Sequence, residues 1–183
     1  MDRQQAFTFL KDNLKDEYTV KHCLALEAIM RALAKRFNED AEKWGLTGLM
    51  HDVDWDLTKE DMANHSLRGA EMLEKAGFPE DIVYEVKAHN EAHGFQHKTL
   101  MGRCLGAADN LTGLIIACAL VQPDKRLASV RPESVLKKFK NKGFAAGTDR
   151  ERIRKCEEFG IPLQEFITLG LSAMQEIAPE LGL

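Results

Sequence analysis

The chain has 183 residues, of which 44% are apolar and 30% are charged, the balance of an ordinary globular protein with one domain. Its 25 basic and 29 acidic side chains give a net charge of −4, which argues against a protein that mainly binds the phosphate backbone of a nucleic acid. The longest apolar run, Leu111–Val121, is shorter than the ~20 residues of a membrane span. The N-terminal segment carries acids and no apolar stretch, so it predicts no signal peptide.

Helical spacing of apolar residues begins near the N-terminus, where Phe7, Leu10 and Leu14 lie three and four residues apart. Residues 52–64 break the pattern, contain many acids and predict a loop. Gly77 follows one later helical stretch and predicts its end. In the first two thirds of the chain, the predicted helices cover about residues 7–14, 20–37, 40–51, 62–76, 79–93 and 98–121.

The last third of the chain is also predicted to be helical. One helix is expected from Pro132 to about residue 140, and a capping-box spacing at Thr148 and Glu151 predicts another to about residue 159. A third begins at Pro162, and no segment has the alternating pattern of a strand. The sequence therefore predicts a compact all-α fold of about eight or nine helices in a single domain, residues 1–183.

A histidine and an aspartate are adjacent at the predicted end of a helix. Successive helical residues point about 100° apart, so His51 and Asp52 reach one ion only if the backbone turns there. Residues 52–56 supply that turn. A single His-Asp step also occurs by chance, so the pair predicts a metal site only in company with other residues.

Two polar residues stand inside apolar helices. A buried histidine such as His22 needs partners for its ring nitrogens. Asp109 lies in the most apolar predicted helix, where a carboxylate is costly without a cation, and no Lys or Arg stands one turn away on that helix. A metal ion is one explanation for both residues. A hydrogen-bonded core histidine and an aspartate paired with an arginine of another helix are the structural alternatives.

These residues together resemble the HD-domain superfamily of metal-dependent phosphohydrolases, and within it the small HDIG-type proteins. The family pattern is a His, then a His-Asp step, then a distant Asp. It is matched in order by His22, His51, Asp52 and Asp109, and His65 and His89 resemble the two histidines that two-metal members add.

The resemblance covers about residues 18–122, and the helices expected over residues 123–183 lie outside it. It implies an HD-type helical fold with six metal ligands: His22, His51, Asp52, His65, His89 and Asp109. Imidazole and carboxylate ligands suit one or two divalent ions of Mn, Fe, Co, Ni or Zn. With two ions, Asp52 is expected to form the bridge. Val53 and Asp54 stand where the family's Ile-Gly would follow, and no Gly-Tyr-Pro comes after them, which argues against a cyclic dinucleotide phosphodiesterase.

The resemblance implies a phosphohydrolase that acts on a small phosphate ester, nucleotides included, through a metal-activated water. His51 and Asp52 are the expected catalytic residues. Two alternatives remain open: a di-iron oxygenase on the same fold, and a nucleotide-binding regulatory module without activity. The sequence predicts neither membrane nor nucleic acid as a partner, and it leaves the oligomeric state open.

Several residues have weaker predictions. His93, Arg68 and Lys87 are candidate contacts to the substrate, and Glu85, one turn before His89, is a candidate to orient its ring. A basic cluster near the C-terminus either steers a phosphorylated substrate or forms a solvated helix face; its members are Lys137, Lys138, Lys140, Lys142, Arg150, Arg152, Arg154 and Lys155. The four cysteines form no CxxC pair and predict reduced thiols in a cytoplasmic protein.

Overall fold

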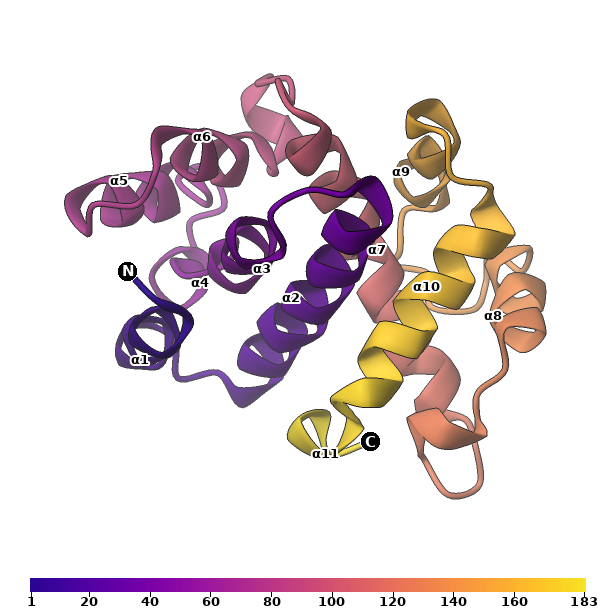
Figure 1. Cartoon of the computed structure of the whole chain (residues 1–183). Coiled ribbons are helices and arrows are strands. Elements are labelled where there is room, and N and C mark those ends of the chain that lie inside the picture. Colours follow the sequence, from indigo (N-terminus) through magenta and orange to yellow (C-terminus); the bar gives the residue numbers. More distant parts are fainter.

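The computed structural model describes residues 1–183 and contains helices and no strand, so the predicted all-α class is confirmed (Figure 1). Eight helices have eight or more residues: α1 (Arg3–Asn13), α2 (Glu17–Phe37), α3 (Ala41–Met50), α5 (Leu67–Lys75), α6 (Glu80–Ala88), α7 (Leu100–Leu120), α8 (Pro132–Phe139) and α10 (Leu163–Glu176). Three are shorter: α4 (Trp55–Thr58), α9 (Arg150–Arg154) and α11 (Ala178–Leu181). Three 3-10 turns complete the chain: η1 (Glu91–His93), η2 (Leu127–Ser129) and η3 (Lys155–Phe159).

Polar side chains mark where the principal helices begin. Asp16 and Asp40 precede α2 and α3 and accept hydrogen bonds from first-turn N–H groups, and Thr99 does the same for α7. Such caps satisfy N–H groups that have no partner within the helix. Their positions fix where each helix starts, and therefore which turn of α2 and of α7 carries His22 and Asp109.

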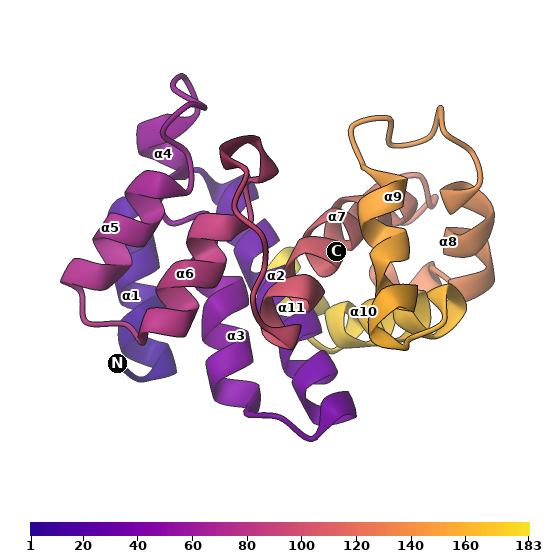
Figure 2. The ribbon, with the colours of Figure 1, turned by 90° about the horizontal axis from the view of Figure 1, so that it is seen from above.

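Helix α2 lies at the centre of the molecule and packs against α3, α7 and α10. Figure 2 shows α1 and α3–α6 on one side and α8–α10 on the other, with α2 and α7 between them. Helix α3 approaches the backbone of α2 closely at Gly48, where a Cβ atom would come within 2.9 Å of the Leu26 carbonyl oxygen. Glycine thus lets the end of α3, and with it His51, lie directly against α2.

One hydrophobic cluster of 45 buried residues runs from Ala6 in α1 to Leu181 in α11. Members of α8 and α10 pack on α7 in the same cluster as the residues of α2. Helix α7 alone is long and apolar enough to cross a membrane, although the sequence pattern indicated that its apolar run was too short. Since 67% of that window is buried inside the protein, the apolar residues of α7 serve the core.

The structure differs from several local expectations. Residues 55–58, predicted as part of a loop, form the short helix α4, and the helix expected over residues 62–76 begins only at Leu67. The helix expected over residues 79–93 ends at Ala88 and is followed by a 3-10 turn that stops at Gly94, whose φ of 73° suits glycine. The last difference concerns the capping box: Asp149, not Thr148, caps α9, because its carboxylate reaches the N–H groups of the first turn.

Candidate metal centre

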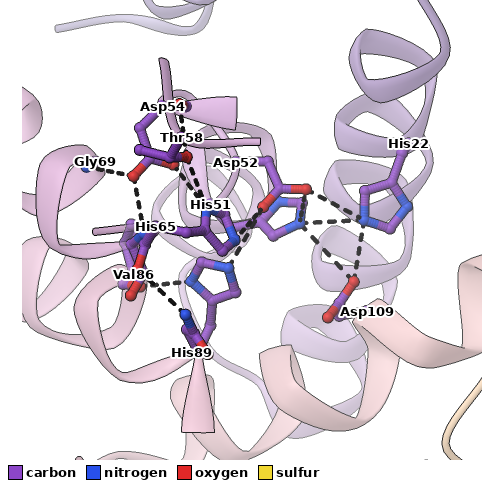
Figure 3. A network of polar contacts seen from close by, with 12 residues as sticks. His22, His51, Asp52, Asp54, Thr58, His65, Gly69, Val86, His89 and Asp109 are labelled. Carbon is purple, nitrogen blue, oxygen red and sulfur yellow. Dashed lines mark hydrogen bonds and ion pairs between the residues drawn. The ribbon is translucent and has the colours of Figure 1, made fainter. Parts of the chain in front are cut away.

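Four helices and the loop after α3 bring the six predicted ligands together (Figure 3). His22 comes from α2, His51 and Asp52 follow α3, and Asp109 lies in α7. The His22 Nε2 atom lies 3.1 Å from His51 Nε2 and 3.0 Å from Asp109 Oδ1, and His51 Nε2 lies 3.1 Å from Asp52 Oδ2. These four residues form the first half of the centre.

The second half forms on the other oxygen of the same aspartate. His65, just before α5, and His89, at the end of α6, each place Nε2 3.4 Å from Asp52 Oδ1. Potential ligand atoms of His22, His51 and Asp52 lie within 4.8 Å of one another, and so do those of Asp52, His65 and His89. Asp52 therefore directs one oxygen to each half, the arrangement of a bridging carboxylate.

The outer ring nitrogens show which side of each imidazole faces the centre. His51 Nδ1 lies 2.9 Å from the Gly48 carbonyl oxygen, and His89 Nδ1 lies 2.5 Å from that of Val86. A carbonyl oxygen can only accept, so Nδ1 is the donor in both rings. In the neutral imidazole, Nε2 then carries a lone pair and points inward.

The other two histidines, His22 and His65, are held in the same tautomer by side-chain acceptors. The Thr112 hydroxyl donates its proton to the Asp109 carbonyl oxygen. The Thr112 oxygen is then free to accept a hydrogen bond from His22 Nδ1 at 2.9 Å. His65 Nδ1 donates to Asp54 Oδ1 at 3.1 Å. In their neutral form all four rings therefore present Nε2 lone pairs to the centre.

This donor set fits metal ions. Four imidazole lone pairs and two carboxylates converge, and every ion pair within the set joins a histidine to an aspartate. Acceptors at 3 Å repel unless a proton or a cation lies between them. No Lys or Arg forms an ion pair with Asp52 or Asp109, so divalent ions are the natural counter-charge.

In the absence of a cation, the centre retains protons. Burial opposes charge on His51, but attraction by Asp52 raises the pKa of His51 well above its usual range. Burial likewise opposes charge on Asp109, but the hydrogen bond with His22 lowers the pKa of Asp109 to about 2. A metal ion that binds here must therefore displace a proton.

Asp54 is a functional candidate that the sequence reasoning missed. Its side chain is 0% exposed and accepts from His65, from the Ser66 N–H at 2.8 Å and from the Gly69 N–H at 2.9 Å. Ser66 has a φ of 71°, an unfavourable value for a residue with a Cβ atom. Asp54 therefore holds His65 and the backbone after it, and its position two residues after Asp52 was the available signal. Thr112, three residues after Asp109, was missed in the same way.

The centre opens to solvent on the side of His22 and Asp109, whose side chains are 16% and 21% exposed, while His51 is 1% exposed. A cavity of about 310 Å³ lies there, which we call the mouth. Its lining residues are Asp16, Tyr18, Thr19, His22, Asp52, Trp55, Asp109, Asn110, Gly113, Gly147 and Thr148. No Lys or Arg is among them, and the last two come from the loop before α9.

The weaker candidates lie outside the centre. His93 Nε2 lies 2.7 Å from the His65 carbonyl oxygen and so supports the backbone of a ligand residue. Arg68 is exposed and pairs with Glu71, while Lys87 Nζ lies 4.5 Å from the centroid of the Phe95 ring. The structure thus brings neither Arg68 nor Lys87 to the six residues.

Glu85 does not orient His89 as expected. It instead accepts from His97 Nδ1 at 2.7 Å and from the N–H and hydroxyl of Thr99. The ring of His89 is held by the backbone of its own helix, because its partner is the Val86 carbonyl oxygen.

Part of the basic cluster holds the C-terminal segment in place. Arg150 donates to backbone carbonyl oxygens of Ala145 and Thr148, and Lys155 pairs with Glu91. Arg152 Nη2 donates to the His89 carbonyl oxygen at 2.8 Å. These contacts tie α9 to the second half of the centre.

Comparison with known proteins agrees with this geometry. The chain is 28% identical over 95 residues to Ribonuclease Y of Desulfotalea psychrophila (strain LSv54 / DSM 12343), a match that covers 51% of this chain. This region corresponds to 18% of that relative's length. No solved structure matches the chain. The HD domain family model matches residues 19–114, a range that includes all six candidate ligands. The chain therefore belongs to the HD-domain superfamily of metal-dependent phosphohydrolases.

Proposed function

We propose that the protein hydrolyses a phosphate ester of a small molecule, nucleotides included, with two divalent transition-metal ions bound between the six ligands. The convergence of four histidine lone pairs and two carboxylates, with no basic side chain among them, supports this most directly. Family membership supports the class of chemistry.

The mouth supports a mechanism that depends on metal. A phosphate that enters it meets the carboxylates of Asp16, Asp52 and Asp109 and no Lys or Arg. When bound, the cations would neutralise the phosphate and lower the pKa of a water molecule at the centre. Without them the mouth repels a phosphate, so cation-free protein is expected to be inactive.

The chain's own residues provide position and charge. His51, almost fully buried between its Gly48 carbonyl partner and Asp52, keeps one rotamer and one tautomer. Asp52 serves both halves, and Asp109 and His22 form the edge nearest the mouth. In hydrolysis the water oxygen bonds to phosphorus, the ester P–O bond breaks and the departing oxygen takes a proton.

The size and charge of the mouth support a small ester over RNA, although the relative from Desulfotalea psychrophila is named a ribonuclease. A cavity of about 310 Å³ suits a small organic phosphate. A bound RNA would need basic side chains along its backbone. The four cysteines are buried and unpaired, which supports a reducing compartment such as the cytoplasm.

The test is metal analysis of purified protein followed by phosphate release from p-nitrophenyl phosphate, with Mn, Fe, Co, Ni or Zn restored after chelation. We expect bound transition metal and metal-dependent phosphate release. Oxygen uptake by the iron-loaded protein without phosphate release would favour the oxygenase. Nucleotide-dependent thermal stabilisation without turnover under every metal would favour the regulatory module, and cleavage of an RNA oligonucleotide alone would favour a nuclease.

A further inference from the structure

The charges around the mouth limit what else a substrate can carry. The cavity is lined by three carboxylates and no Lys or Arg. Asp54, behind His65, adds a fourth carboxylate close to the centre. Two divalent ions carry four positive charges, which the carboxylates of Asp52 and Asp109 and one phosphate dianion already balance. A second anionic group on the substrate therefore finds no free positive charge.

Basic side chains near the mouth are already engaged elsewhere. Arg150 donates to the backbone carbonyl oxygens of Phe144, Ala145 and Thr148. Lys59 pairs with Asp56 at 3.0 Å, and Lys15 Nζ donates to the Lys11 carbonyl oxygen. None of the three lines the cavity.

The outer wall of the mouth favours neutral or cationic groups. Asp16 accepts two hydrogen bonds from Thr19, and these lower the pKa of Asp16, so it is charged at neutral pH. The aromatic residues Tyr18, 65% exposed, and Trp55 line the cavity, and aromatic faces attract cations. Asn110 and Thr148 add uncharged hydrogen-bonding groups.

We propose that the substrate carries a single phosphate and that its organic part is neutral or cationic, so that esters with a second anionic group are rejected. This selectivity rests on the proposed function, because the phosphate is assumed to lie at the metal centre. It concerns the part of the substrate that lies in the mouth, beyond the six ligands. Unlike charges there attract and like charges repel, and one such pair changes affinity by about tenfold.

The experiment uses matched compounds that differ only in the terminal group. The substrates are 3-aminopropyl, 3-hydroxypropyl and 3-carboxypropyl phosphate, and the non-hydrolysable set is the corresponding phosphonates. Calorimetry measures the binding of the phosphonates to metal-loaded protein, and phosphate release gives kcat/KM for the esters. We expect the amine to equal or exceed the alcohol, and the carboxylate to be at least about tenfold worse than the alcohol in both measurements.

Two variants test whether the mouth causes this preference. Asp16→Asn keeps the helix cap and removes the charge, so the gap between amine and carboxylate should narrow. Thr148→Lys places a cation in the mouth and should improve the carboxylate compounds. Glu71→Gln, on an exposed residue of α5 outside the mouth, matches the charge change of Asp16→Asn and should leave the preference intact.

The outcomes separate the two proposals. If the phosphonates bind in the expected order and no ester is hydrolysed, the charge preference stands and the hydrolase proposal fails. If all esters are hydrolysed equally well, or the carboxylate best, the charge preference is overturned and the hydrolase proposal stands. If Asp16→Asn and Thr148→Lys both keep the preference of the parent protein, the proposed charge preference is also overturned, because the mouth would not be the source of the selectivity.

Discussion

Helix α2 carries a buried glutamate and a partly exposed histidine, and their surroundings differ in whether the chain itself supplies a counter-charge. Glu27, 4% exposed, accepts a bidentate pair from Arg3 at 3.0 and 3.1 Å and a third hydrogen bond from Arg31 at 3.0 Å. On the same helix, His22 faces a centre of acceptors with no basic side chain. The two arginines balance the negative charge of Glu27 within the chain, whereas no basic side chain does this at the candidate metal centre. Burial of charge alone therefore does not identify a site; the lack of an internal counter-charge does.

The largest effect should come from removing the shared carboxylate. Asp52→Ala removes one ligand atom from each half of the centre. Metal affinity and phosphate release should therefore fall by more than ~100-fold, the upper end of the loss when a residue that only hydrogen-bonds to a ligand is removed. Metal analysis and phosphate release measure both, and circular dichroism should show helix content unchanged. Glu71→Ala is the control, since Glu71 is exposed and pairs with the exposed Arg68 outside the centre. Turnover retained by Asp52→Ala would refute its role.

Breaking the internally neutralised cluster should have the opposite signature. Glu27→Gln leaves Arg3 and Arg31 without their carboxylate and should lower the free energy of unfolding by about 2 kcal/mol, which is less than for a fully buried pair because both arginines are partly exposed. Urea unfolding measures this loss, with Glu71→Gln expected within ~0.5 kcal/mol of the parent. Metal stoichiometry should be unchanged; loss of metal would mean that the two sites on α2 are not independent.

A smaller effect is expected from the hydroxyl behind His22. Thr112→Val keeps the shape of the side chain but removes the acceptor for His22 Nδ1, which should weaken metal binding about tenfold. Equilibrium dialysis against a competing chelator measures this change. Thr112→Ser restores the hydroxyl and should bind metal nearly as the parent does. Equal affinities in Val and Ser variants would show that the relay to Asp109 is unimportant.

The smallest effect concerns the buried carboxylate of Glu85, which, like that of Glu27, accepts hydrogen bonds from other residues of the chain. Burial would raise the pKa of Glu85, but hydrogen bonds from His97 and Thr99 outweigh it and lower this pKa. A lowered pKa stabilises the fold above the unfolded value of about 4.3, and this contribution is lost as pH falls through the folded pKa. The free energy of unfolding of Glu85→Gln should therefore depend less on pH than the parent's between about pH 5 and 3. Parallel pH profiles would contradict the assignment.

The helical class and the six candidate ligands could be read from the sequence because both leave repeating or distinctive patterns in it. Apolar residues at helical spacing mark α2 and α7, and His22, His51, Asp52 and Asp109 match a family pattern in order. The structure places these residues within contact of one another, as that pattern required.

What the sequence did not reveal depends on contacts between distant residues. Asp54 is buried only because α5 folds over it and offers the N–H groups of Ser66 and Gly69. Glu85 is four residues from His89, the spacing of a helical contact, yet the loop before α7 brings His97 closer. The end of α6 and the start of α9 likewise depend on which backbone groups find partners, and local spacing does not encode that choice.

The hydrogen bond from Arg152 to the backbone of His89 has a consequence for how this enzyme family can diversify. The segment that follows the recognised domain reaches back both to a ligand residue and, through Gly147 and Thr148, to the entrance of the centre. Replacement of this tail could therefore retune selectivity while every ligand stays in place. A deletion that keeps only the recognised domain would preserve the motif and yet lose its outer support.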